Sequence, residues 1–193
     1  MKIEIRSDTV HIEGYVNAVG RDSRVIPDRR GGFIEQVEPG TFRRSLENGK
    51  PVEIRLNHGR VLGSTGDGVL SLYEDAIGLH ASADIGDEEV ADLARRGELR
   101  GWSFGFQNPI DEWEEGEPPR RKLKGFDLLE VSLIDRRMTP AYIGTSVEAR
   151  GHENLLTEFR GEEEEPEVSR EKEPEYHPDY ALKRKILNLK RSR

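Results

Sequence analysis

Residues 99–106 read Leu-Arg-Gly-Trp-Ser-Phe-Gly-Phe, and the rest of the chain is organised around them. Aromatic side chains at every second position are typical of a strand with one buried face. Ser103 stands on the opposite face, between two glycines, and invites a chemical explanation. Elsewhere in the sequence, His58 closes one apolar run and Glu130 stands within another. The three residue types are those of a nucleophile, its base and the group that orients the base.

Each of these residues also fits a structural role. A serine between strand glycines is typical of a close backbone approach, and a histidine at a strand end is typical of a surface position. Glu130 is stronger evidence for a functional site than the other two residues, because a carboxylate within an apolar strand is costly to bury unless it is paired. An imidazole N–H would be a suitable partner.

Residues 101–105 also match the G-x-S-x-G nucleophile elbow of α/β-hydrolases. That motif requires a helix directly after the serine, and the chain order serine, acid, histidine. Here strand-like sequence continues past Phe106, and His58 precedes Ser103. We therefore reject the elbow but retain the serine as a candidate.

The length and composition of the chain exclude several classes of function. The chain has 193 residues, which is sufficient for one folded domain. A net charge of −8 argues against nucleic acid as a direct ligand, and the absence of cysteine excludes thiolate sites. No pair of histidines has metal-ligand spacing, so we expect no metal or cofactor. No apolar run approaches the ~20 residues needed to cross a membrane, which predicts a soluble, intracellular protein with no membrane partner.

Apolar alternation predicts an antiparallel strand meander over most of residues 1–150, with two short helices. One helix is predicted within 39–49, capped by Thr41, and the other after the capping residue Asp87. The expected strands are 51–56, 61–66, 68–73, 78–85, 99–107 and 123–134, and residues 2–12 are expected to form two strands or one strand interrupted at the Ser7-Asp8 turn signal. Charged segments at 21–32 and 111–122 are predicted to be loops. The last two strands form a hairpin that carries Ser103 on one arm and Glu130 on the other.

The C-terminal part has a different composition. Between residues 158 and 179 there are ten acidic residues, three basic residues and three prolines, so burial would offset little of the entropy lost on ordering. We therefore expect residues 151–179 to be a disordered acidic linker. Residues 180–193 carry six Lys or Arg and apolar residues at helical spacing, which predicts a basic amphipathic tail.

With these stretches in order, the chain resembles the prohead maturation proteases of tailed bacteriophages, serine peptidases related in fold to the herpesvirus assembly protease, assemblin. The resemblance spans about residues 10–150 and depends on the order of short motifs. These are Gly14-Tyr15-Val16, residues 32–42, Leu56-Asn57-His58, Gly78-Leu79, residues 97–99, residues 101–106, Glu130-Val131-Ser132-Leu133 and Pro140-Ala141-Tyr142. Phage relatives commonly have an acidic residue after the histidine, where this chain has Gly59.

The resemblance implies a mainly β fold with peripheral helices, in which residues 1–150 form a closed antiparallel β-barrel of the assemblin type. It implies a nucleophile at Ser103, a base at His58 and a third member at Glu130, where the herpesvirus relatives use a second histidine. It also suggests that Arg136 and Arg137 help to build the oxyanion site, as a paired arginine does in assemblin.

The resemblance further implies a serine endopeptidase of phage procapsid maturation, acting inside the procapsid in the host bacterial cytoplasm. Its substrates would be scaffold segments, the N-terminal part of the major capsid protein and the protease itself, and a homodimer is possible. Two alternatives stay open at this stage. One is a procapsid-binding scaffold module without catalysis, and the other is a hydrolase of small esters.

Overall fold

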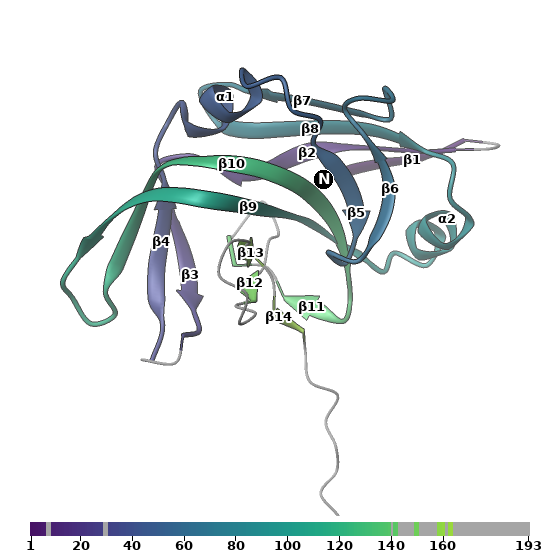
Figure 1. The fold of residues 1–193 in the computed structure, drawn as a ribbon. Coiled ribbons are helices and arrows are strands. Elements are labelled where there is room, and N and C mark those ends of the chain that lie inside the picture. The colour runs from purple at the N-terminus through teal and green to yellow at the C-terminus, as the bar shows by residue number, and fades with distance from the viewer. Residues whose placement is uncertain are drawn as a thin grey trace, which may run out of the picture.

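The computed structural model describes residues 1–6, 9–28, 31–139 and 141–142, together with the backbone of three short strands beyond them (Figure 1). In chain order the elements are β1 (Lys2–Ile5), β2 (Val10–Ala18), β3 (Asp22–Ile26), β4 (Phe33–Val37), α1 (Thr41–Leu46), β5 (Glu53–Leu56), β6 (Arg60–Ser64), β7 (Leu70–Glu74), β8 (Gly78–Ile85), α2 (Glu88–Arg95), β9 (Leu99–Glu114), β10 (Arg120–Asp135), β11 (Met138–Thr139), β12 (Ala149–Arg150), β13 (Glu158–Arg160) and β14 (Glu162–Glu163). Apart from β13 and β14, the predicted linker 151–179 and the predicted tail 180–193 lie outside the described residues.

One sheet joins four antiparallel strands in the order β1-β2-β8-β7. In β8 every second side chain is buried: Leu79, Ala81, Ala83 and Ile85. This is the period-two pattern of a strand with one face on a core. The strand predicted at 78–85 is confirmed with the same bounds.

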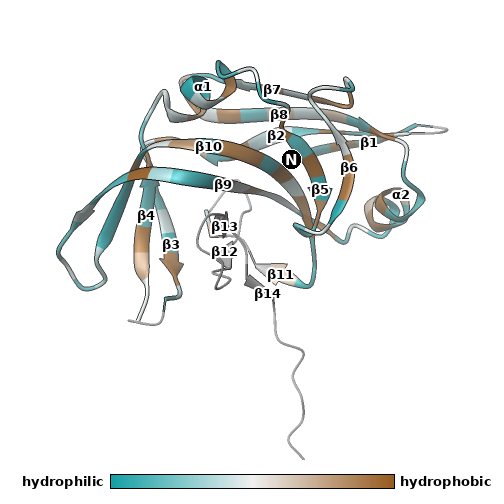
Figure 2. Cartoon of the chain, in the orientation of Figure 1, coloured by the Kyte–Doolittle hydropathy of each residue, from teal (hydrophilic) through white to brown (hydrophobic). Residues whose placement is uncertain are grey.

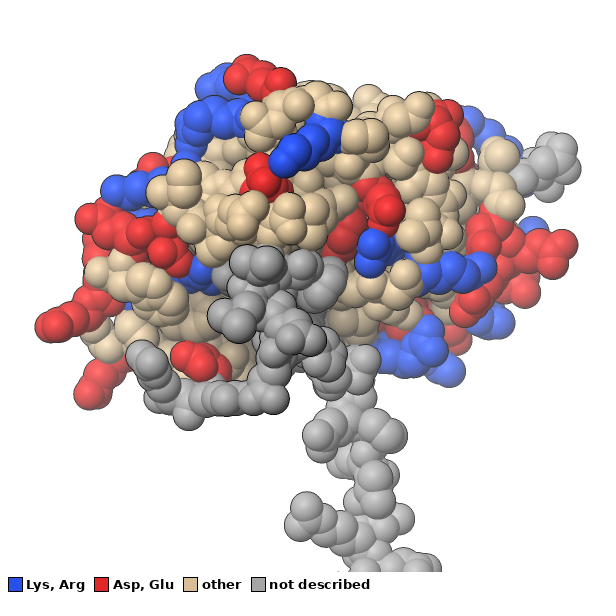
Figure 3. All heavy atoms as spheres, viewed as in Figure 1, with Lys and Arg blue, Asp and Glu red and all other residues tan. Residues whose placement is uncertain are grey.

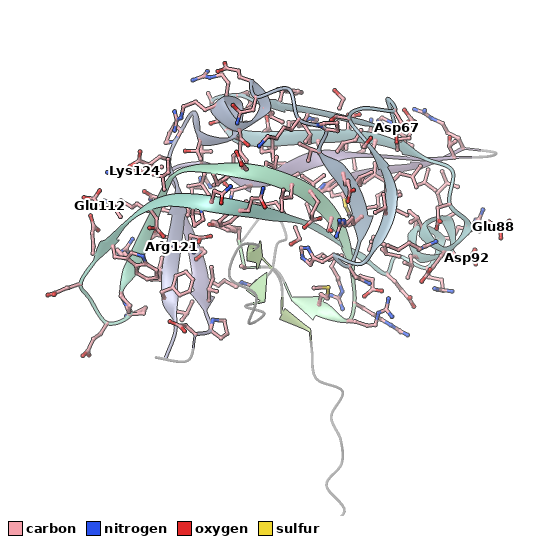
Figure 4. The ribbon with its side chains drawn as sticks, viewed as in Figure 1. Asp67, Glu88, Asp92, Glu112, Arg121 and Lys124 are labelled. Atoms are coloured by element: carbon pink, nitrogen blue, oxygen red, sulfur yellow. The ribbon has the colours of Figure 1, made fainter. Side chains whose placement is uncertain are left out.

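The second sheet is built on the long hairpin of β9 and β10, whose strands have 16 residues each. The loop predicted at 111–122 is wrong, because most of that segment extends the two strands. Its charges alternate across the hairpin, where Lys124 pairs with Glu112 and Lys122 pairs with Glu114. In the strand register Lys122 faces Glu112 and reaches diagonally to Glu114, and opposite charges at such diagonal positions lie within reach of long side chains and stabilise the pairing. Glu112 and Lys124 lie together toward the far end of the hairpin (Figure 4).

β10 pairs with two strands besides β9. Residues 120–123 run parallel to 34–37 of β4, and residues 130–133 run parallel to 53–56 of β5. β3 in turn pairs with β4, so the loop predicted at 21–32 is also wrong in part. The result is a mixed sheet that extends to both ends of β10 and brings β5 beside the stretch that contains Glu130.

The fold is mainly β with two short helices, as predicted, but hydrogen bonds among the described strands do not close a barrel. They form the four-stranded sheet, the larger sheet around β10 and the two-stranded pair of β11 with β14. β9 bonds with β10 along one edge and with β13 along the other. β2 therefore lies against β9 through side-chain packing instead of adding to its edge. The expectation of a closed antiparallel barrel is therefore corrected in two respects: the strands do not close, and β10 pairs in parallel with β4 and β5.

Both predicted helices are present, although they are capped differently from each other. Asp87 caps α2 as predicted, because its carboxylate accepts a hydrogen bond from the Val90 N–H at 3.0 Å. Thr41 does not cap α1, whose N-cap is Gly40. Instead, the carboxylate of Glu74 on β7 accepts hydrogen bonds from the N–H groups of Gly40 and Arg43 at 2.6 and 2.7 Å. A long-range contact thus replaces the local cap.

The core lies between the two sheets and α1, and it confirms the prediction that Trp102, Phe104 and Phe106 of β9 are buried. The Phe104 ring packs edge-on against Phe42 of α1 at 5.2 Å, and Phe106 stacks on Phe126 at 4.7 Å. Figure 2 shows hydrophobic residues where β10 passes beneath β2 and β8, and hydrophilic residues at the far end of the hairpin. This packing holds one face of β9 rigidly, and Ser103 stands on the other face.

The surface is of mixed charge. On the face seen in Figure 3, acidic and basic side chains of the described residues are interspersed, and this face carries no broad basic patch. Broad basic patches are the usual mark of phosphate-backbone binding. Neither helix in the described part of the chain has the length and apolar character needed to span a membrane.

Candidate active site

The structure brings Ser103, His58 and Glu130 together, although they come from three elements. Ser103 lies on β9 and Glu130 on β10, and His58 lies in the turn between β5 and β6. The Ser103 Oγ lies 2.6 Å from Nε2 of His58, and the Nδ1 of the same ring lies 2.7 Å from Oε1 of Glu130. The three side chains thus form one continuous hydrogen-bonded chain.

Ser103 is placed by the register of the hairpin. It faces Ser132 directly across the β9–β10 pair, and its side chain is fully buried. Gly101 before it has a φ of 151°, in the region that L side chains rarely adopt. Gly101 and Gly105, two positions before and after the serine on the same face of the strand, have no side chains that could occupy the space of the imidazole.

β13 lies on the outer edge of β9, close to Ser103. It runs antiparallel to β9, with Glu158 opposite Phe106 and Phe159 opposite Gly105. The edge of the strand that carries Ser103 therefore accepts an extended polypeptide segment within two residues of the serine.

His58 owes its position to an unusual turn. Asn57 and His58 both have a positive φ, 50° and 58°, and the Gly59 N–H bonds back to the Leu56 carbonyl at 3.1 Å. Positive φ at both central residues is typical of a tight hairpin turn, where glycine is usual at the second position. A histidine held there is strained by about 1–3 kcal/mol, and such strain clusters at functional sites.

The turn is held by side chains from β10. The amide of Asn57 donates to the carboxylate of Asp135 at 3.0 Å and accepts from the Asp135 N–H at 3.1 Å. Arg137 binds the same carboxylate through its side chain and its backbone N–H. Burial alone would raise the pKa of Asp135, but the hydrogen bonds from Arg137 and Asn57 outweigh it and hold that pKa below its ordinary value. Asp135 is therefore an ionised anchor for the histidine turn.

Glu130 is buried, with 1% of its surface exposed, and both of its oxygens are engaged. Oε1 accepts from the Nδ1–H of His58, and Oε2 accepts from the hydroxyl of Ser132 at 2.5 Å. An ionised carboxylate has no proton to donate, so the Nδ1 of His58 carries the proton and Nε2 presents its lone pair to Ser103. The arrangement can remove a proton from the serine hydroxyl and hold the resulting imidazolium beside a negative charge.

Residues 1–158 of the chain match the sequence model of the family described as "Caudovirus prohead serine protease". The chain belongs to this family. Comparison with curated proteins and with solved structures found no match. The resemblance noted from the sequence motifs is thereby confirmed, and the enzyme class is that of a serine protease.

Two further residues of this prohead protease were predicted near the reaction centre. Arg136 forms an ion pair with Glu98 at 3.3 Å and has a largely exposed side chain, and Arg137 binds Asp135. Through Asp135, Arg137 is thus connected to the histidine turn. The oxyanion role of Arg136 and Arg137 stays a prediction.

Sequence reasoning missed several groups that hold the residues of the candidate site in place. Ser132 stands two positions after Glu130, and residues at this spacing share one face of a strand, so its proximity could have been inferred. Asn57 precedes His58 directly, but its role depends on Asp135, 78 residues away. No local signal in the sequence connects these two residues.

Two other kinds of site can be compared with the fold: the nucleophile elbow of α/β-hydrolases and a metal site. β9 continues as a strand to Glu114, so no helix follows the G-x-S-x-G stretch as the hydrolase elbow requires. In the described part of the chain, no three His, Asp or Glu side chains gather closely enough to bind a metal ion.

Proposed function

We propose that the chain is a serine endopeptidase in which Ser103 is the nucleophile, His58 the general base and Glu130 the group that orients the base. The observation that carries this proposal is the pair of short contacts at the two nitrogens of one imidazole, 2.6 Å to Ser103 and 2.7 Å to Glu130. The first lies within the range in which a base can take a proton from a hydroxyl, and the second is a hydrogen bond that can orient the imidazole.

In the proposed reaction, Nε2 of His58 takes the hydroxyl proton of Ser103 as Oγ bonds to the carbonyl carbon of a peptide. The tetrahedral oxyanion is stabilised by nearby donors and collapses as the imidazolium returns the proton to the leaving amine. Water then attacks the acyl-serine ester as His58 takes its proton, and the C–Oγ bond breaks as the imidazolium returns that proton to Ser103, which releases the acid. Glu130 keeps Nδ1 protonated throughout and stabilises the imidazolium.

The position of β13 supports a polypeptide substrate. Peptides commonly bind by adding a strand to an exposed sheet edge, where main-chain hydrogen bonds supply affinity. The edge of β9 at Gly105 and Phe106 already pairs with a segment of the same chain. A substrate in the same antiparallel arrangement would present its backbone to Ser103, and we infer that the segment around 158–160 can itself be cut.

Family membership implies a protease of procapsid maturation, with substrates among capsid and scaffold proteins. We propose that those substrates are scaffold segments or the N-terminal part of the major capsid protein, together with the protease itself. Cleavage would take place inside the procapsid, in the cytoplasm of a bacterial host.

The test is co-expression of the protein with the capsid gene product encoded beside it, followed by intact-mass spectrometry of both chains. The wild type should produce truncated capsid protein and a shortened protease, and Ser103→Ala should produce neither. Truncation that persists in Ser103→Ala would refute the nucleophile assignment. If both chains stay intact with the wild type, the alternative of a scaffold-binding module without catalysis is favoured.

A further inference from the structure

Ser132 of β10 is a buried side chain that contacts two members of the proposed catalytic group at once. It is fully inaccessible to solvent. Its hydroxyl donates to Oε2 of Glu130 at 2.5 Å, and its oxygen accepts from the backbone N–H of His58 at 3.2 Å. One small group therefore joins the carboxylate to the backbone of the histidine.

The two hydrogen bonds act on different properties of the site. The bond to Oε2 fixes the rotation of the Glu130 carboxylate, so that Oε1 stays directed at the imidazole. The bond from the His58 N–H fastens the turn in which His58 is held at a φ of 58°. Because strained conformations persist only where surrounding contacts determine them, this second bond bears directly on the placement of the ring.

We propose that Ser132 is a positioning residue of the protease, which sets the geometry of both His58 and Glu130 through one hydroxyl. The inference rests on the proposed function of the three residues it serves. Ser132 is not an alternative nucleophile, since its hydroxyl proton is directed to Glu130, whereas the Oγ of Ser103 contacts the imidazole.

Removing the hydroxyl affects both partners. In Ser132→Ala, Oε2 of the buried Glu130 carboxylate and the backbone N–H of His58 each lose the Ser132 hydroxyl as a hydrogen-bond partner. The net free energy of a hydrogen bond to a charged group corresponds to about a 10- to 100-fold change in a reaction rate that depends on that bond. The activation of Ser103 should fall by that factor.

The experiment compares Ser132→Ala and Ser132→Thr with a matched control, Ser23→Ala. Ser23 is also a buried strand serine in the same sheet, and its hydroxyl donates to the Arg24 carbonyl and accepts from the Glu35 N–H. It lies on β3, away from the histidine turn. Ser132→Thr keeps the hydroxyl and tests rescue, and Ser132→Cys, which nearly conserves volume, replaces Ser132→Ala if that variant does not fold.

Two measurements are made on each full-length variant. The first is the second-order rate constant for labelling by a fluorophosphonate probe, which reports how strongly Ser103 is activated. The second is the proton NMR signal of the His58 Nδ1–H in histidine-labelled protein, assigned by its absence in His58→Gln. This signal reports the contact between His58 and Glu130 and requires no catalysis.

We expect Ser132→Ala to lose or shift the Nδ1–H signal and to label about 10- to 100-fold more slowly, with Ser132→Thr close to wild type. Ser23→Ala should keep both properties. An unchanged signal and labelling rate in Ser132→Ala would overturn the inference. Failure of the wild type to label refutes the proposed function instead, and the NMR comparison still decides whether Ser132 positions the pair.

Discussion

Glu130→Gln tests the central geometry, because it keeps the shape of the side chain while it removes the charge and turns one of the two acceptors into a donor. Glu130 uses Oε1 for the Nδ1–H of His58 and Oε2 for the hydroxyl of Ser132. A glutamine has one acceptor and one donor end, so it cannot accept at both places. Two orientations of the amide are possible, and each disrupts a different contact.

If the amide oxygen faces His58, the NH₂ group faces Ser132, and the Ser132 hydroxyl proton loses its described acceptor. If the NH₂ group faces His58 instead, Nδ1 must accept and the proton moves to Nε2, where it blocks removal of the Ser103 proton. In both cases the imidazolium lacks a buried negative charge beside it. By analogy with triads in which the carboxylate was replaced by its amide, the rate should fall by about 10⁴-fold. The unpaired buried group should also destabilise the fold by about 1–3 kcal/mol.

The assay is fluorophosphonate labelling at pH 7, together with urea unfolding of the same protein. Glu35→Gln is the matched control, because Glu35 is another fully buried carboxylate in the same sheet, bonded to Tyr142 at 3.0 Å. It should lose stability but label at the rate of the wild type. A wild-type labelling rate in Glu130→Gln would show that Glu130 does not orient the base.

Four further outcomes are expected. Ser103→Ala and His58→Ala should each reduce peptide cleavage by about 10⁶-fold, and the double variant should be no worse; additive losses would contradict a single catalytic unit. The stability advantage of the wild type over Asp135→Asn, measured by urea unfolding, should be present at pH 7 and should diminish as the pH falls below about 3.9, because the folded-state pKa of Asp135 is lowered. Glu74→Gln should cost about 0.5–2 kcal/mol of unfolding free energy through weaker capping of α1, and an unchanged urea midpoint would exclude that cap. Deletion of residues 164–193 should leave fluorophosphonate labelling unchanged but lower the amount of protease packaged into procapsids, if the basic tail binds an acidic scaffold surface; unchanged packaging would contradict this targeting role.

The local features of the site could be predicted because their causes are local. Glu130 within an apolar run requires a buried partner on grounds of charge alone, and the alternation of aromatics around Ser103 assigns the serine to the opposite face. Asp87 caps its own helix from the adjacent position. In each case the determining residues lie within a few positions of one another.

The features that sequence reasoning missed depend on partners far away in the chain. The capping of α1 by Glu74 spans more than 30 residues, and the pairing of Asn57 with Asp135 spans 78. The charged stretch at 111–122 predicts a loop because its charges favour solvent when each strand is considered alone. Their compensation across the hairpin becomes evident only once the register is known. The parallel pairing of β10 with β4 and β5 likewise has no local signature.

The parallel contacts of β10 have a consequence for synthesis on the ribosome. β4 and β5 leave the exit tunnel long before β10 does, and they have no complete sheet to join until residues 120–135 emerge. His58 is separated from Ser103 by 45 residues and from Glu130 by 72. Because such non-local contacts form late, a nascent chain cannot assemble the three side chains until nearly the whole domain has been translated. The topology therefore delays proteolytic competence until β10 has been made, which protects both the protease and its neighbours during the earlier part of its synthesis.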